Sequence, residues 1–177
     1  AGGMAKVLAD AGPLAGKVLN NALVDSYEVG SQNWTPKFRE EFKARRGYDP
    51  LPFLPVVTGR VIESKEISER FLWDFRRTIA ELLAENHYGE IARIAHERGL
   101  TNYGEALEDH RPTFGDDVEM RRFADIPMAA MWTYGTRAEP LPTYVADIQG
   151  AASVAHLYGR GLVAAEYWRP RQDSHRC

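Results

Sequence analysis

The chain has 177 residues, 44% of them hydrophobic, and a formal net charge of −3, so it is long enough for one globular domain. Its charge balance does not favour binding to nucleic acid or to a membrane surface. The one cysteine, Cys177, excludes an intrachain disulfide framework, and the longest apolar runs are far too short to span a bilayer.

The N-terminal part predicts a helix followed by a buried strand. Apolar residues at roughly helical spacing predict a helix over residues 4–11, which Gly12 and Pro13 then interrupt. The apolar run that follows breaks into acids and a glycine, which is typical of a buried strand that ends at a site. We therefore expect a strand over residues 22–27.

A second helix is expected after a polar and aromatic loop. Thr35 and Pro36 are typical of a helix start, with Thr35 as the N-cap and Pro36 in the first turn, and Gly47 is expected to end the helix. The proline-rich stretch 48–55 predicts a rigid turn without regular structure.

The longest helical pattern covers residues 64–98. Ser64 lies at its start as a capping candidate, and apolar residues then recur every three or four positions. The segment 86–89 (N-H-Y-G) is expected to divide or bend this helix, and Gly99 to end it.

The C-terminal half repeats the alternation of strand and helix. Strands are expected over residues 100–107 and 162–166, a helix over 143–158, and a short apolar segment over 124–128. The alternation predicts parallel strands with crossover helices, and strands that are apolar throughout agree with burial on both faces. The sequence therefore predicts the α/β class.

Acidic residues follow three of the predicted strands. Glu28, Glu105 and Glu166 each lie at or near a carboxyl end, and in a parallel barrel those ends meet on one face. Paired carboxylates suit glycoside hydrolysis, in which one protonates the leaving oxygen and the other activates water or attacks. Acids at strand ends also bind metals, cap helices or pair with arginine, so their spacing leaves these alternatives open.

Amide and aromatic side chains near the same ends suggest sugar contacts. Candidate substrate-binding residues besides Glu105 are Asp25, Tyr27, Asn33, Trp34 and Trp132. Ring faces can pack on sugar C–H groups, and amides can bond to sugar hydroxyls. For Asn33 and Trp34 the alternative is a loop anchored on the rim of the fold.

The linked order of several motifs resembles glycoside hydrolase family 106, the α-L-rhamnosidases that act on plant polysaccharides and rhamnosides. The motifs are D-S-Y-E-x-G-x-Q-N-W-T, F-x-x-E-F-x-x-R-R-G-Y-D-P, F-L-W-D-F-R-x-T, G-E-A-L-E-D-x-R-P, D-I-P-M, A-S-V-A-H-x-Y-G and V-A-A-E. Together they cover almost all of residues 21–168, and their order is far more specific than any one of them.

The resemblance implies a (β/α)8 catalytic barrel, calcium dependence and an inverting mechanism with two glutamates. Glu28 matches a catalytic glutamate and is assigned as the general acid, and Glu166 is assigned as the partner that activates water. Glu105 is a further sugar contact, a metal ligand or an alternative base. The resemblance also implies a carbohydrate partner and a periplasmic or extracellular location.

Known members are several times longer, so residues 1–177 are expected to be one fragment with about half of the barrel, ending in an irregular tail over 169–177. Such a fragment is expected to be inactive by itself. Many members carry an acid two positions before Trp132, where this chain has Ala130. That departure motivates an alternative, a non-catalytic carbohydrate-binding or degenerate barrel protein. A barrel glycosidase of another specificity is a third reading.

Overall fold

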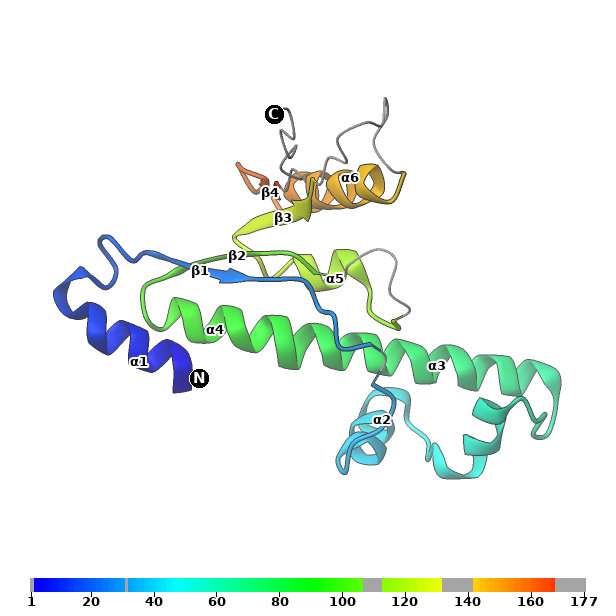
Figure 1. Cartoon of the computed structure of the whole chain (residues 1–177). Coiled ribbons are helices and arrows are strands. Elements are labelled where there is room, and N and C mark those ends of the chain that lie inside the picture. Colours follow the sequence, from blue (N-terminus) through cyan, green and yellow to red (C-terminus); the bar gives the residue numbers. More distant parts are fainter. Residues whose placement is uncertain (1, 31, 107–112, 132–141, 168–177) are drawn as a thin grey trace, which may run out of the picture.

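The computed structural model describes residues 2–30, 32–106, 113–131 and 142–167 (Figure 1). Four strands form one sheet in the order β1-β2-β3-β4, and every neighbouring pair is parallel. The strands are β1 (Asn21–Val24), β2 (Thr101–Gly104), β3 (Ile126–Ala130) and β4 (Ala164–Glu166). This order confirms the predicted α/β class with crossover connections.

Two helices precede β1, and the other helices connect each strand to the next. They are α1 (Gly2–Ala11), η1 (Gly12–Leu14), α2 (Phe38–Arg46), η2 (Leu51–Thr58), α3 (Lys65–Leu83), η3 (Ala84–Gly89), α4 (Glu90–His96), α5 (Asp117–Arg121) and α6 (Pro142–Leu157). Within the described residues, no helix has the length and apolar character that crossing a membrane requires.

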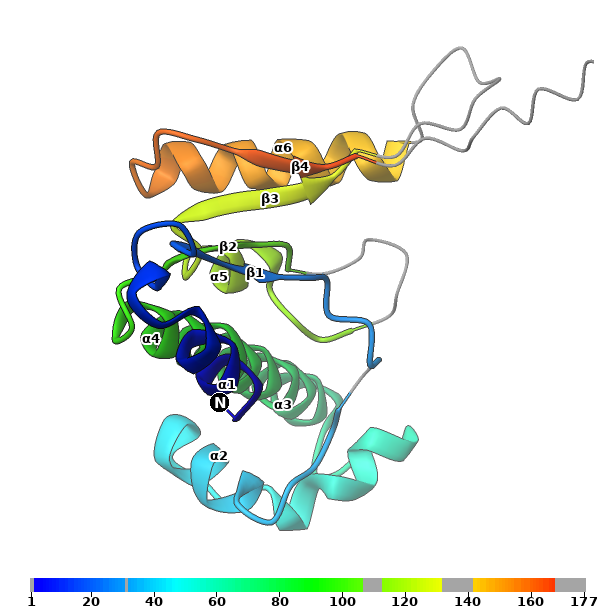
Figure 2. The same cartoon turned by 60° about the vertical axis from the view of Figure 1, so that its left-hand side comes forward.

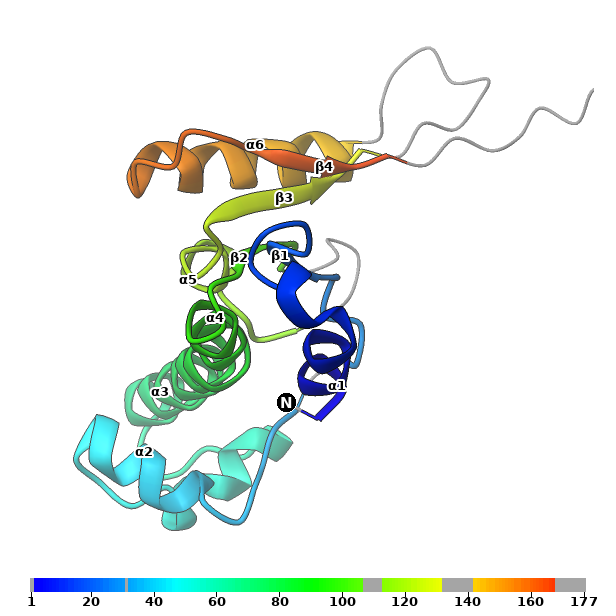
Figure 3. The same cartoon turned by 90° about the vertical axis from the view of Figure 1, so that its left-hand side faces the viewer.

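The helices lie against the sheet in two groups. The long run formed by α3, η3 and α4 lies alongside β1 and β2, with α2 on its far side (Figures 1 and 3). Helix α6 lies alongside β3 and β4 (Figure 2). The arrangement buries most of β3, whereas Leu23 of β1 is 54% exposed and no residue of β4 is buried, so the predicted burial on both faces is wrong for the two outer strands.

The largest apolar cluster lies away from the strands, between α2, η2 and α3. Its buried members are Phe38, Phe42, Val56, Phe71, Phe75 and Ile79. A second cluster joins η3 to the ends of β1 and β2, with Ala84, Tyr88, Ala106 and Met120 buried in it. The second cluster therefore lies beneath the carboxyl ends of the strands.

Several elements differ from the prediction, and one of them is strand β2, which ends at Gly104 instead of residue 107. Helix α2 begins at Phe38, and Thr35 is not its N-cap: the Phe38 N–H donates to the Thr35 carbonyl at 3.0 Å in a preceding turn. The stretch predicted to be irregular contains the 3₁₀ helix η2, because Pro52 and Pro55 restrict the backbone to helix-compatible φ values. Strand β1 ends at Val24, three residues earlier than expected.

The long helix begins where predicted, and a π-helical turn lies at the segment that is expected to divide or bend it. The Ser64 side chain accepts a hydrogen bond from the Ile67 N–H at 3.2 Å and caps α3. At residues 86–89 the chain stays helical, and a π-helical turn, η3, joins α3 to α4. A π turn accommodates an extra residue without breaking the helix.

Two elements were not predicted. Strand β3 lies between β2 and β4 although it contains Pro127, which is paired with Gly104 in the register. Helix α5 has five residues, too few for a visible helical period, and the Asp116 side chain caps it by accepting the Glu119 N–H at 3.1 Å.

Candidate active site

Acidic side chains from three strands meet at the carboxyl edge of the sheet. Asp25 and Glu28 follow β1, Glu105 follows β2, and Glu166 is the last residue of β4. They line one cavity of about 140 Å³, whose described lining residues are Asp25, Ser26, Glu28, Glu105, Ala130, Tyr144 and Glu166. The structure therefore brings together both predicted catalytic glutamates, and their roles in catalysis stay predictions.

The strand register explains why these residues are neighbours. Val24 pairs with Gly104, so Asp25 and Glu105 each come one residue after a paired position. Gly104 allows this pairing, since a Cβ at that residue would lie 2.4 Å from the carbonyl oxygen of Val24. On the other side of the sheet Ala130 pairs with Glu166. Parallel strands thus end at one edge with their acids together.

The loop after β1 is organised by its own polar groups. The Asp25 carboxylate accepts a hydrogen bond from the Ser26 N–H at 2.8 Å, and the Ser26 hydroxyl donates to Glu28 at 3.2 Å. Both carboxylates are exposed, as expected for groups that must reach a ligand. Ser26 is a lining residue that sequence analysis did not select.

Glu105 is the buried acid of the group, with 5% of its surface exposed. Burial raises the pKa of its carboxyl to about 7, with further contributions from the negative charges of Glu166, Asp147 and Asp25, while Arg121 opposes the shift. One carboxyl oxygen, Oε1, is buried without a hydrogen-bond partner among the described residues. Glu105 is therefore able to hold a proton near neutral pH.

Three of these acids are arranged as a cation site requires. Asp25, Glu105 and Glu166 each offer a carboxylate oxygen, and these oxygens lie within 4.8 Å of one another. Oxygen ligands about 2.3–2.6 Å from one Ca²⁺ ion span that range. The unpartnered Oε1 of Glu105 is a further sign that the group fits a hard cation.

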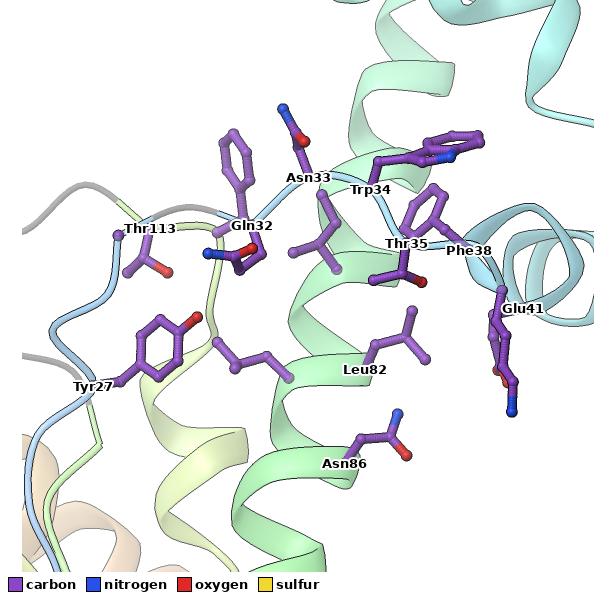
Figure 4. Close-up of a pocket in the computed structure, with 15 residues that line it drawn as sticks. Tyr27, Gln32, Asn33, Trp34, Thr35, Phe38, Glu41, Leu82, Asn86 and Thr113 are labelled. Carbon is purple, nitrogen blue, oxygen red and sulfur yellow. The ribbon is translucent and has the colours of Figure 1, made fainter.

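The predicted sugar contacts Tyr27, Asn33 and Trp34 lie at a different cavity, of about 370 Å³. This cavity lies between the loop after β1 and the stretch of helix that includes Leu82 and Asn86; Tyr27 lies at one end of the labelled residues and Glu41 at the other (Figure 4). The structure thus does not bring these residues into the acidic cavity, and sugar contact by them stays a prediction. Trp132 lies outside the described residues.

A buried ion-pair network contacts Ala130, which lines the acidic cavity. This network was not predicted from the sequence. Arg121, 2% exposed, donates to Asp117 at 2.8 and 2.9 Å, to the Met128 carbonyl and to Asp147. Asp147 in turn accepts the N–H of Ala130 at 2.6 Å. The spacing of Asp117 and Arg121 on one helix face was the available signal. The network fixes the end of β3 beside Glu166.

A parallel α/β sheet that brings several carboxylates into one cavity is typical of enzymes that cleave glycosidic bonds with paired acids. Comparison with known sequences gives the particular family. The chain belongs to glycoside hydrolase family 106, described as alpha-L-rhamnosidase, whose sequence pattern matches residues 4–176. The resemblance found in the sequence motifs is confirmed.

Two relatives show how much of a larger protein the chain represents. A protein of Formosa agariphila named "Putative beta-glucuronidase" is 41% identical over 165 residues, 93% of this chain and 13% of that protein. The structure of a rhamnosidase from Novosphingobium sp. PP1Y matches with a TM-score of 0.77 and 57% identity, over 84% of this chain and 14% of that one. The chain therefore spans only about 13–14% of the length of these relatives.

Proposed function

We propose that the protein containing this chain hydrolyses terminal α-L-rhamnosides with inversion, and that the four strands are part of a (β/α)8 barrel. The observation that carries the proposal is the acidic cavity, where Asp25, Glu28, Glu105 and Glu166 meet from three strands. Membership of the α-L-rhamnosidase family and 57% identity to a rhamnosidase support it.

The proposed reaction needs one carboxyl group as acid and one as base. Glu28 gives its proton to the glycosidic oxygen while the bond from that oxygen to the anomeric carbon breaks. Glu166 takes a proton from water, whose oxygen bonds to the anomeric carbon from the opposite face. Where no cation is bound, protonated Glu105 can donate a hydrogen bond to a sugar hydroxyl, since its pKa of about 7 keeps a large fraction protonated at neutral pH; a bound cation would hold it as the carboxylate.

A calcium ion is part of the proposal. Oxygens of Asp25, Glu105 and Glu166 would hold it, as their mutual distances and hard-ligand chemistry allow. When bound, the ion would reduce repulsion among the carboxylates and attract sugar hydroxyl groups. An extracellular or periplasmic location, expected from the family resemblance, belongs to the same proposal.

A glucuronide is the second candidate substrate, suggested by the name of the Formosa relative. The described lining of the acidic cavity favours the neutral sugar, because it contains four carboxylates and no lysine, arginine or histidine to pair with a uronate. A non-catalytic carbohydrate-binding protein is the third candidate, and Ala130 favours it by lining the cavity at the position where the family resemblance leads us to expect an acid.

The proposal is tested by release of p-nitrophenol from p-nitrophenyl α-L-rhamnoside and from the matching β-D-glucuronide, using the protein that carries this chain. We expect hydrolysis of the rhamnoside, with the anomeric configuration inverted in the first product seen by NMR. Glu28→Gln and Glu166→Gln should each lower kcat by roughly a hundredfold to ten-thousandfold. Chelation with EDTA should lower activity, and added calcium should restore it.

Glu69→Gln, an exposed acid on α3, is the matched control and should leave kcat unchanged. Rhamnoside hydrolysis that survives both active-site substitutions would remove the assignment of acid and base. Exclusive hydrolysis of the glucuronide would replace the substrate, and binding of L-rhamnose without hydrolysis of either glycoside would favour the non-catalytic protein.

A further inference from the structure

A buried tyrosine at the π-helical turn η3 is bonded to the residue that follows Glu105 of the acidic cavity. Tyr88 is 5% exposed, and its hydroxyl donates a hydrogen bond to the carbonyl of Ala106 at 2.7 Å. It comes from a helix, whereas Ala106 follows β2, so the bond joins two layers of the fold. In the sequence, Tyr88 belongs only to the segment 86–89 that predicts a division or bend of the helix.

The carbonyl of Ala106 also connects the two strand extensions that carry acids. It accepts the N–H of Tyr27 at 2.8 Å as well as the Tyr88 hydroxyl. Ala106 comes immediately after Glu105, and Tyr27 lies between Ser26 and Glu28. One oxygen atom therefore links the backbone next to Glu105, the backbone next to Glu28 and the helix beneath both.

This link extends the sheet beyond the assigned strands. The N–H of Glu105 donates to the carbonyl of Val24 at 3.0 Å, so the β1–β2 ladder continues one step past Gly104. The hydrogen bond from the Tyr27 N–H to the Ala106 carbonyl follows it and joins the same two segments. Tyr88 thus stabilises the last described hydrogen bond between these two segments, at the point where they leave the sheet.

The π turn and a glycine allow the tyrosine to reach this carbonyl. The extra residue in a π turn rotates the helix surface that follows by about 100° relative to a continuous α-helix. Gly89 then permits close packing, since a Cβ there would lie 3.1 Å from the ring of Phe123. Tyr88 packs with Ala84, Ala106 and Met120, so its ring has a fixed place.

We infer that Tyr88 is a positioning residue of the acidic cavity: its bond to the Ala106 carbonyl fixes Glu28 relative to Glu105 and, across the cavity, to Glu166. The inference rests on the proposed function, in which Glu28 and Glu166 act as a pair. The distance between their carboxyl groups determines whether the reaction inverts or retains the anomeric configuration. A displacement of about 1 Å in such a pair costs on the order of a hundredfold in rate.

Tyr88→Phe removes one oxygen and keeps the ring that packs in the core. In the protein that carries this chain, we expect kcat for p-nitrophenyl α-L-rhamnoside to fall by about tenfold or more, with KM changed by less than about twofold. The kcat must be calculated per folded enzyme, with the folded fraction measured by circular dichroism, because a general loss of stability would lower the apparent kcat and leave KM unchanged in the same way.

Tyr48→Phe is the matched control. The Tyr48 hydroxyl bonds to Asp74 at 2.9 Å between a loop and α3, so the variant loses a similar bond that has no link to the acidic cavity. It should keep the wild-type kcat. An unchanged kcat in Tyr88→Phe, or an equal loss in Tyr48→Phe, would overturn the inference.

Amide hydrogen exchange measures the positioning independently of activity. In Tyr88→Phe, peptides that contain Tyr27 and Glu28 should exchange at least about threefold faster than in the wild type, because the hydrogen bond between the two segments is weaker, and Tyr48→Phe should leave them unchanged. If the wild type hydrolyses no rhamnoside, the proposed function fails, and exchange alone decides on Tyr88: equal exchange in Tyr88→Phe and wild type would refute the positioning role.

Discussion

At the scale of single residues, Glu105 combines burial with negatively charged neighbours. Burial raises the pKa of its carboxyl from 4.5 to about 7, and the charges of Glu166, Asp147 and Asp25 add to the effect. Because the pKa is higher in the folded than in the unfolded chain, the folded state keeps its proton over a range where the unfolded state loses it. Ionised Glu105 therefore costs stability.

The sign of the pH dependence follows from this shift. Below about pH 4.5 both states are protonated and the cost is absent; between about pH 4.5 and 7 the stability falls as pH rises, and above about pH 7 the full cost of about 3 kcal/mol applies. Glu105→Gln should thus raise the free energy of unfolding at about pH 8 by up to about 3 kcal/mol, and change it little at about pH 4.

Urea unfolding in EDTA at both pH values measures this difference. Exposed Glu69→Gln is the control and should leave the free energy of unfolding nearly unchanged at each pH. Equal destabilisation by Glu105→Gln at both pH values would show that the carboxyl serves as a structural hydrogen-bonding group and carries no buried charge.

The sequence predicted these acids because a carboxylate at or near the end of an apolar run can be recognised from the sequence alone. Glu28, Glu105 and Glu166 were selected in that way, and the structure places all three around one cavity. The position of Tyr27 could not be predicted so well, because residues alternate across an extended chain and a shift of one residue changes the face. Tyr27 lines the cavity on the helix side, whereas Ser26 and Glu28 line the acidic one.

At the scale of elements, the Arg121 network holds α5, α6 and β3 together. Arg121 lies in α5, Asp147 in α6, and the carbonyl of Met128 and N–H of Ala130 in β3. Removing the guanidinium leaves the Asp147 carboxylate, 9% exposed, buried without its partner charge. Arg121→Met should therefore lower the free energy of unfolding by about 3–5 kcal/mol.

Chemical denaturation of the chain measures this loss, with Arg93→Met as the control. Arg93 pairs with Glu90 and Glu97 on the exposed face of α4, so its removal should leave the free energy of unfolding nearly unchanged. Replacing Asp147 by Asn in the Arg121→Met background should recover part of the stability. Equal effects of the two arginine substitutions would contradict a structural role for the buried pair.

Elements with a clear period were predictable, and elements defined by their neighbours were not. Helix α3 was expected from its apolar spacing and the Ser64 cap, both of which are local signals. Strand β3 has five residues and contains Pro127, which argues against a central strand when the sequence is read alone. Its place between β2 and β4 depends on helix α6 packing against it, and on the buried Arg121 that binds its backbone.

At the scale of the whole molecule, the sheet has two outer strands, and this agrees with the proposal that it is part of a barrel. Among the described residues, β1 pairs only with β2, and β4 only with β3. Apolar side chains are exposed at both outer strands. Leu23 in β1 is 54% exposed, and Leu162 just before β4 is 66% exposed. In a closed barrel, further strands would cover such edges.

The 177-residue chain by itself should therefore self-associate through these edges. Analytical ultracentrifugation over a range of protein concentrations should show species larger than the monomer, because unpaired strands with apolar neighbours pair readily.

Val163→Lys, a substitution beside the outer edge of β4, should shift the equilibrium toward monomer, since a charge on an edge opposes pairing. Leu157→Lys changes a side chain that is 69% exposed on α6 and should leave the distribution as it is. A chain that stays monomeric at every concentration would show that its edges are already protected, and would count against the incomplete barrel.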